Sequence, residues 1–209
     1  MIKITWGFIL TVVLGVLLLG ASSPVWAQSS PPGPGETVTE IINKGLGILR
    51  DPSLQTPDKM LDRRQQLWDL LEPIFDFDEI GRRALGQYWR TINKTDQQRF
   101  LTAFTKMMKR MYLHKSDLYK EGDVQYTGEI LHGKRAKVQT NFVKANGEKI
   151  EVDLSMYNAN GDGWKVYDVQ VAGVSVLGNY RSQFDSILTK SSFEDLMKKI
   201  EEKINEPEK

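Results

Sequence analysis

Few side chains in this sequence are suited to covalent or acid–base chemistry. The chain has no cysteine and only two histidines, His114 and His132, which excludes thiolate chemistry and limits general-base chemistry. Ser175 follows Gly173 where a predicted strand meets a predicted helix, as a hydrolase nucleophile does. The Gly-x-Ser-x-Gly pattern fails at Leu177, however, and both histidines precede the serine. We therefore expect Ser175 to cap the following helix. The alternative interpretation is that Ser175 is the nucleophile of a small periplasmic esterase.

Three neighbouring carboxylates, Asp76, Asp78 and Glu79, are the next candidates for acid–base work or metal binding. Asp76 with Glu79 three residues later is a helix-capping arrangement, and acidic side chains are favourable in a first turn. The two histidines are too few to complete a site of three or four converging ligands. We expect a capped helix here, and neither catalytic residues nor a metal site in the chain.

Hydrophobic periodicity and capping signals predict the elements that position these residues. Helices are expected over 37–50, 57–72, 76–86, 96–118, 176–189 and 193–205. Thr95 is expected to cap the longest helix, and the strongly charged last helix is expected to lie on the surface or fray. Strands are expected over 124–131, 135–144, 149–158 and 164–171, with a primed two-residue turn at Asn146-Gly147. The fold class is therefore α+β, a four-stranded or larger antiparallel β-meander wrapped by about six or seven helices.

One face of the predicted sheet is apolar and must be covered by helices; its residues are Ala136, Val138, Phe142, Ile150, Val152, Leu154 and Met156. The helices carry many methionine and aromatic side chains, which suit a deformable pocket as well as a core. We predict an apolar cavity between sheet and helices, although periodicity alone predicts a filled core equally well.

The N-terminal segment has the features of a secretory signal peptide in their usual order. Lys3 precedes an apolar run over 8–21, and Val25-Trp26-Ala27 is a cleavage sequence with a small residue at its end. The run is shorter than the ~20 residues of a membrane-spanning helix. We predict a signal peptide over 1–27 cut after Ala27, a flexible Pro/Gly/Ser leader over 28–35 and a single domain over 36–205. Export without cysteine fits a bacterial periplasm.

The charge balance argues against a nucleic-acid partner. The whole chain has 28 basic and 27 acidic residues, a net charge of +1. Lys3 belongs to the predicted signal peptide, so the remaining basic and acidic residues balance. Such a chain lacks the summed positive potential of a nucleic-acid-binding domain.

Two long segments resemble the signatures of the MlaC family, also called the toluene-tolerance or phospholipid-transport auxiliary family. The first comprises 75–86, Tyr88-Trp89 and 95–104, and the second comprises 163–169, 173–175 and 179–184. The resemblance extends over roughly 37–196, nearly the whole predicted mature chain.

This resemblance implies a soluble periplasmic shuttle with no cofactor and no catalytic residue. Such proteins carry a glycerophospholipid between an outer-membrane lipoprotein complex and an inner-membrane ABC transporter complex. The transporter complex includes a membrane-anchored substrate-binding subunit. This transport maintains the lipid asymmetry of the outer membrane. The implied ligand is a diacyl phospholipid; a hopanoid or other lipid is the alternative, because one offshoot of the family is associated with hopanoids. The resemblance and the apolar excess together predict a lipid-binding wall of Phe75, Ile80, Leu85, Tyr88, Trp89, Phe104, Met107, Met108, Met111, Val152, Leu154, Val174, Tyr180 and Phe184.

The residues themselves leave three classes of function open. The first is a lipid carrier, the second a small esterase or isomerase in a cone-shaped α+β fold, and the third a chaperone-like periplasmic protein with a solid core. Phospholipid that co-purifies with the protein supports the first class, and its absence favours the others.

Overall fold

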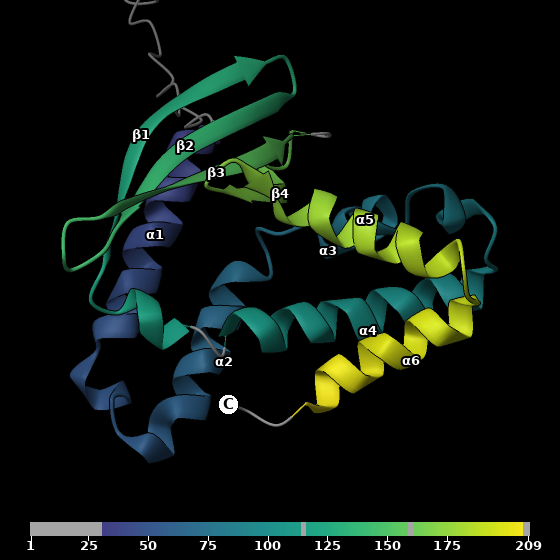
Figure 1. Ribbon diagram of the computed structural model, residues 1–209. Coiled ribbons are helices and arrows are strands. Elements are labelled where there is room, and N and C mark those ends of the chain that lie inside the picture. The colour runs from purple at the N-terminus through teal and green to yellow at the C-terminus, as the bar shows by residue number, and fades with distance from the viewer. Residues whose placement is uncertain (1–30, 114–115, 159–160, 207–209) are drawn as a thin grey trace, which may run out of the picture. The chain divides into compact units, whose positions relative to one another are not determined.

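The computed structural model describes residues 31–113, 116–158 and 161–206 (Figure 1). The predicted signal peptide, most of the leader and His114 lie outside the described residues. The described part of the chain contains six α-helices and one five-stranded sheet, which confirms the α+β class. In chain order the elements are α1 (Pro34–Arg50), α2 (Met60–Leu71), α3 (Phe77–Leu85), α4 (Lys94–Leu113), β1 (Asp123–His132), β2 (Arg135–Val143), β3 (Lys149–Tyr157), β4 (Lys165–Val171), β5 (Val174–Ser175), α5 (Val176–Leu188) and α6 (Phe193–Asn205).

The five strands form one antiparallel meander in the order β1-β2-β3-β4-β5. Ala136 pairs with Met156 and Val138 with Leu154, so the side chains expected to share the apolar face do share it. Ala136, Val138 and Met156 are buried, and α1 packs against β1 and β2 on this face (Figure 1). Val152 and Leu154 on β3 are only half-buried. The helices therefore cover the apolar face incompletely.

One hairpin turn differs from its prediction, and one further hairpin was not predicted. In the described loop between β2 and β3, only Gly147 has a positive φ (84°), and its N–H donates to the Lys144 carbonyl. A primed two-residue turn at Asn146-Gly147 needs a positive φ at Asn146, which this residue does not have, so that prediction is wrong. Positive φ at both central residues, as in a type I′ turn, occurs between β4 and β5, where Ala172 and Gly173 have φ of 48° and 78°. This turn creates the two-residue strand β5, which periodicity did not predict, and leads directly into α5.

Contact with the sheet sets the start of α1. The helix begins at Pro34 and not at Thr37, so Pro34 and Gly35 belong to its first turn rather than to the leader. The Gly35 N–H donates to Glu129 Oε2 on β1 at 2.7 Å. A carboxylate is favourable at a helix N-terminus, and a first-turn proline lacks an N–H that the helix would leave unpaired. This long-range cap is invisible in the local sequence.

The start of α4 also corrects a prediction. Asn93 caps the helix, because its Oδ1 accepts the Asp96 N–H at 2.9 Å. Thr95 therefore lies in the first turn and is not the cap. The helix ends before Leu118, the predicted end, and the chain passes through a 3-10 turn before it enters β1.

The helix α6 lies at the surface with its charged face exposed, as predicted, but its other face is buried, which was not predicted. Leu196, Met197, Ile200 and Ile204 are buried, and α6 packs against α4 and α5. Ser192 caps the helix, with its Oγ accepting the Asp195 N–H at 3.2 Å. The numerous charges occupy the outer face of an amphipathic helix. The high charge content of the segment therefore concealed that its apolar residues share one face.

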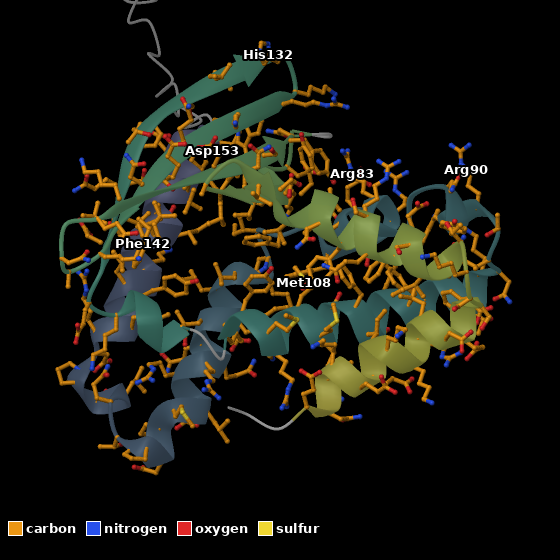
Figure 2. All side chains as sticks on the ribbon, in the orientation of Figure 1. Arg83, Arg90, Met108, His132, Phe142 and Asp153 are labelled. Carbon is orange, nitrogen blue, oxygen red and sulfur yellow. The ribbon has the colours of Figure 1, made fainter. Side chains whose placement is uncertain are left out.

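Buried apolar side chains form three clusters and not one continuous core. The largest joins α3, α4, α5 and α6, and it includes Met108 (Figure 2). The second lies between α1 and the sheet, and the third joins α1, α2 and the end of α4. Phe75 and Phe77 stack at 5.8 Å and contact more than one cluster, yet both are only half-buried. The two rings therefore bridge the clusters while part of their surface stays exposed.

Candidate functional site

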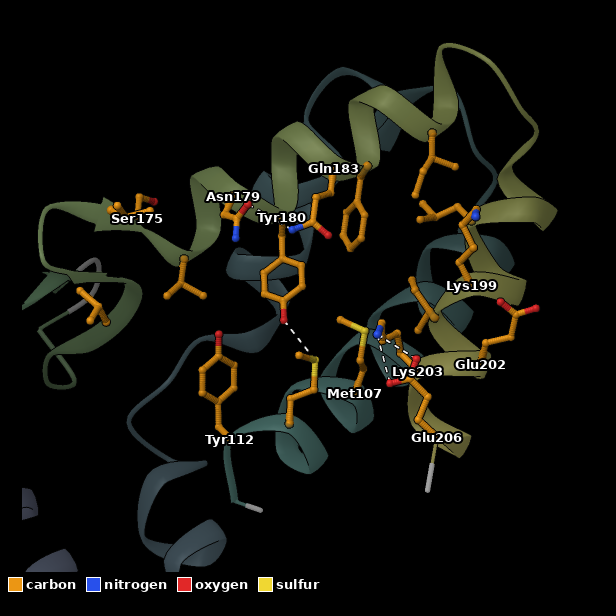
Figure 3. A pocket seen from close by; sticks show the side chains of 18 residues that line it. Met107, Tyr112, Ser175, Asn179, Tyr180, Gln183, Lys199, Glu202, Lys203 and Glu206 are labelled. Carbon is orange, nitrogen blue, oxygen red and sulfur yellow. Dashed lines mark hydrogen bonds and ion pairs between the residues drawn. The ribbon is translucent and has the colours of Figure 1, made fainter. Parts of the chain in front are cut away.

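A cavity of about 500 Å³ opens among α4, the β4–β5 hairpin, α5 and α6 (Figure 3). This volume lies within the ~300–1,000 Å³ range of ordinary small-molecule sites. Each of the three helices contributes apolar or aromatic side chains spaced about one turn apart, so they share a face. These side chains are Met107 and Met111 of α4, Tyr180, Phe184 and Ile187 of α5, and Leu196 and Ile200 of α6.

Two phenol groups interrupt the apolar wall. Tyr180 extends from α5 and Tyr112 from α4, with their hydroxyls directed toward one another (Figure 3). Tyr180 is 8% exposed, and its hydroxyl donates to Met111 Sδ at 3.4 Å. Burial and the adjacent Tyr112 hydroxyl raise the pKa of Tyr180, and burial raises the pKa of Tyr112. Both phenols are therefore protonated hydrogen-bond donors at neutral pH.

Polar side chains surround the mouth of the cavity. On α5, Gln183 Nε2 donates to Asn179 Oδ1 at 3.1 Å. The rim also carries Lys199, Glu202 and Lys203 of α6 and its C-cap residue Glu206, and Lys203 pairs with Glu206 at 2.8 Å. The two ammonium groups and two carboxylates cancel in net charge, so the rim is polar but close to neutral.

The apolar wall continues onto the inner face of the sheet. Val171 and Val174 line the cavity and are 41% and 63% exposed. Across the sheet, Val171 pairs with the half-buried Val152, and Val169 pairs with Leu154. Apolar side chains that remain this exposed and contiguous are typical of a binding groove.

The residues predicted to bind lipid fall into three groups. Lining the cavity are Met107, Met111, Val174, Tyr180 and Phe184. Buried in the helical cluster are Ile80, Leu85, Phe104 and Met108. Half-buried beside the clusters or on the inner sheet face are Phe75, Tyr88, Trp89, Val152 and Leu154. Their contact with a ligand stays a prediction.

Several cavity residues escaped the sequence analysis. Leu196 and Ile200 were missed because α6 was taken for a charged surface helix, although their i, i+4 spacing was the available signal. Tyr112 lies at the edge of the methionine stripe of α4 and was not assigned to the site. The rim is assembled by the packing of α5 against α6, which leaves no local pattern in the sequence.

Ser175 lies at the cavity edge and caps α5, as expected. Its Oγ accepts the Gly178 N–H at 2.7 Å and donates to Asp168 Oδ2 at 2.7 Å. The other oxygen of Asp168 accepts the Leu177 N–H at 3.0 Å. His132, the described histidine, ends β1 and pairs with Arg135 across the first hairpin. Ser175 therefore lacks an adjacent histidine among the described residues, and its hydroxyl is engaged in capping.

The carboxylate cluster at the start of α3 also caps a helix. Asp76 accepts the Glu79 N–H at 2.8 Å and a hydrogen bond from the Tyr157 hydroxyl. Burial opposes ionisation of Glu79, but hydrogen bonds from Arg82 and Arg83 outweigh it and lower the pKa of this carboxyl. Over the described ranges of the chain, no group of three or more potential metal ligands converges. Within the same ranges, no helix is long and apolar enough to cross a membrane.

Comparison with known proteins gives consistent matches. The family model described as MlaC protein matches residues 39–202. The intermembrane phospholipid transport system binding protein MlaC of Haemophilus influenzae is 27% identical over 143 residues, which cover 66% of each chain. The toluene tolerance protein ttg2D of Pseudomonas putida is 27% identical over 192 residues, or 90% of this chain and 86% of that one. A phospholipid-binding protein of Ralstonia solanacearum, solved in complex with a phospholipid, has the same fold, with a TM-score of 0.71 and 24% identity over 80% of this chain and 94% of that one.

Proposed function

Because the chain belongs to the MlaC family, we propose that it is a phospholipid carrier of an intermembrane transport system. The observation that carries this proposal is the cavity of about 500 Å³, whose apolar wall continues onto an incompletely covered sheet face. The names of relatives support it, since the Haemophilus protein is named for phospholipid transport and the Ralstonia protein was solved with a phospholipid. Family membership and the capping role of Ser175 favour carriage over ester hydrolysis.

The lipid is oriented by the polarity of the site. One acyl chain lies among Met107, Met111, Phe184 and Ile200, and the other extends along the inner face of β3 toward Leu154. The headgroup stays in water at the rim formed by α5 and α6. Because the rim charges cancel, headgroup charge has little influence on binding.

Such a ligand does not leave the protein through water. Each buried methylene contributes about 0.8 kcal/mol, so two chains with about 30 methylenes contribute ~24 kcal/mol before ordering costs. Loading and release therefore need direct contact with another apolar site. We assign these contacts to an outer-membrane lipoprotein complex and an inner-membrane ABC transporter complex, which the chain reaches in the periplasm after cleavage of the signal peptide following Ala27.

Mass spectrometry of the organic extract of the purified protein tests this function. We expect close to one diacyl phospholipid per chain, with acyl composition like that of the host membranes. A hopanoid in the extract would identify the alternative ligand. A protein that neither co-purifies with lipid nor takes it up from phospholipid vesicles contradicts the proposal, and a covalent adduct of a serine-reactive phosphonate at Ser175 favours the esterase.

A further inference from the structure

The Tyr112–Tyr180 pair is the polar feature of the cavity interior that neither the fold nor acyl-chain binding explains. Tyr180 is among the most buried residues of α5, and Met111 Sδ, the acceptor of its hydroxyl at 3.4 Å, accepts hydrogen bonds only weakly. Its other polar neighbour is the Tyr112 hydroxyl, which is 44% exposed and can donate its own proton to Tyr180, to water or to a ligand. A buried hydroxyl with an incomplete partner is costly. The Tyr180 hydroxyl therefore gains a stronger acceptor when a ligand oxygen replaces the sulfur.

We propose that the hydroxyls of Tyr112 and Tyr180 bind the ester carbonyl oxygens of the lipid and make the protein selective for ester-linked lipids. This inference rests on the proposed function and names the chemical class of its ligand. Tyr112 and Tyr180 act as specificity-determining residues, and no chemistry is performed on the lipid.

The position of the pair matches that of an ester group in a bound lipid. In a diacyl phospholipid the ester carbonyls lie between the headgroup and the chains. The pair likewise lies between solvent and interior, with Tyr112 44% exposed and Tyr180 8% exposed. On α5, the polar rim residue Asn179 precedes Tyr180, and the apolar wall residue Phe184 follows it by one turn. A lipid with its headgroup at the rim and a chain beside Phe184 therefore places its ester groups near the two hydroxyls.

Hydrogen-bond chemistry gives the direction of the selectivity. A carbonyl oxygen is a stronger acceptor than a thioether sulfur or an ether oxygen, so an ester group satisfies the phenols better than Met111 does. An ether-linked lipid, or a polycyclic hydrocarbon such as the hopanoid skeleton, leaves the buried donor of Tyr180 poorly paired. Sites built to bind a polar group reject analogues that lack it.

A competition between two lipids tests the proposal. The protein is incubated with vesicles that contain equal amounts of a diester and a diether phosphatidylethanolamine with the same chain length, and the bound lipids are quantified by mass spectrometry. We expect the wild-type protein to enrich the diester about threefold to tenfold, the effect of one hydrogen bond. Tyr180→Phe and Tyr112→Phe should each lower this ratio, and the double variant should bind both lipids with a ratio near one.

Tyr126→Phe is the matched control, because Tyr126 is 44% exposed, like Tyr112, and does not line the cavity. It should keep the wild-type preference. Equal binding of both lipids by the wild type overturns the proposal. The proposal is also overturned if the Tyr112 and Tyr180 variants keep the preference for the diester lipid and differ from the wild type only in a lower thermal stability. If Tyr180→Phe does not fold, the competition is measured with Tyr112→Phe alone, because Tyr112 is half-exposed. Failure to bind either lipid contradicts the proposed function instead.

Discussion

Ser175 shows how the surroundings of a residue decide its role. Its sequence context resembles a nucleophile elbow, yet its Oγ links the Gly178 N–H and the Asp168 carboxylate. Asp76 behaves in the same way at the start of α3. Both caps were predictable because their partners lie within three residues. The caps supplied by Glu129 to α1 and by Asn93 to α4 were not predicted, the first because it spans the chain and the second because Thr95 offered a competing signal.

Replacing Ser175 by Ala should destabilise the protein without affecting lipid carriage. The substitution removes the acceptor of the Gly178 N–H, and loss of an N-cap costs about 1 kcal/mol. Urea unfolding measures the stability, and mass spectrometry measures the bound lipid. Ser192→Ala is the control, because Ser192 caps α6 and does not line the cavity. Loss of lipid in the Ser175 variant alone would show that this hydroxyl contacts the ligand.

Tyr157 should make the protein less stable in alkali. The hydrogen bond to Asp76, together with burial, raises the pKa of Tyr157 from 10.0 to about 12. Between these values the folded protein keeps a proton that the unfolded chain has released, so the free energy of unfolding falls as the pH rises from 10 to about 12. Urea unfolding at several pH values in this window should show a steeper fall for the wild type than for Tyr157→Phe. Parallel curves would mean that the Asp76 contact does not perturb Tyr157.

At the scale of elements, α4 separates a core face from a cavity face. Met108 is 9% exposed and lies in the helical cluster, whereas Met111, three residues on, is half-buried and lines the cavity. Helical periodicity assigned both residues to one apolar stripe. Periodicity could not tell which of the two methionines lies in the core and which lines the cavity, because this depends on where α5 and α6 pack.

The same substitution at these two positions should have opposite consequences. Met108→Glu buries a carboxylate without a partner and should unfold most of the protein. Met111→Glu should fold, because its carboxylate can reach water through the cavity mouth, but it should lose most of its bound lipid. Thermal unfolding and lipid content are measured for each variant. A folded Met111→Glu variant that retains its lipid would exclude this face of α4 from the site.

The remaining elements show which signals the sequence carries. Alternation predicted β1 to β4 and the shared face of β2 and β3, because each side chain's face follows from a period of two. The two-residue strand β5 is too short for periodicity. It depends on the backbone of Ala172 and Gly173. The buried face of α6 was hidden by its charges. The hairpin that ends in β5 and the buried face of α6 both line the cavity, so the site was harder to predict than the fold.

At the scale of the whole described chain, three separate clusters replace a single core. A carrier needs this arrangement, since a close-packed interior has no room for a ligand. The helical cluster closes the cavity from one side, and the half-buried residues of β3 and β4 leave apolar surface on the other. The empty carrier should consequently be less stable than the loaded one, because a ligand that binds only the folded state stabilises it.

Exchange of lipid should require physical contact between the carrier and an acceptor. Loaded protein is placed on one side of a dialysis membrane that passes single lipid molecules but neither protein nor vesicles, and acceptor vesicles are placed on the other. A long-chain phospholipid should stay with the protein, because the ~24 kcal/mol gained by burying about 30 methylenes opposes its release into water. The same vesicles mixed directly with the protein should acquire the lipid. A short-chain phospholipid is the control, since it buries fewer methylenes and should cross the membrane unaided. If the long-chain lipid crosses at the rate of the short-chain one, the cavity does not enclose its chains, and release through water replaces transfer by contact.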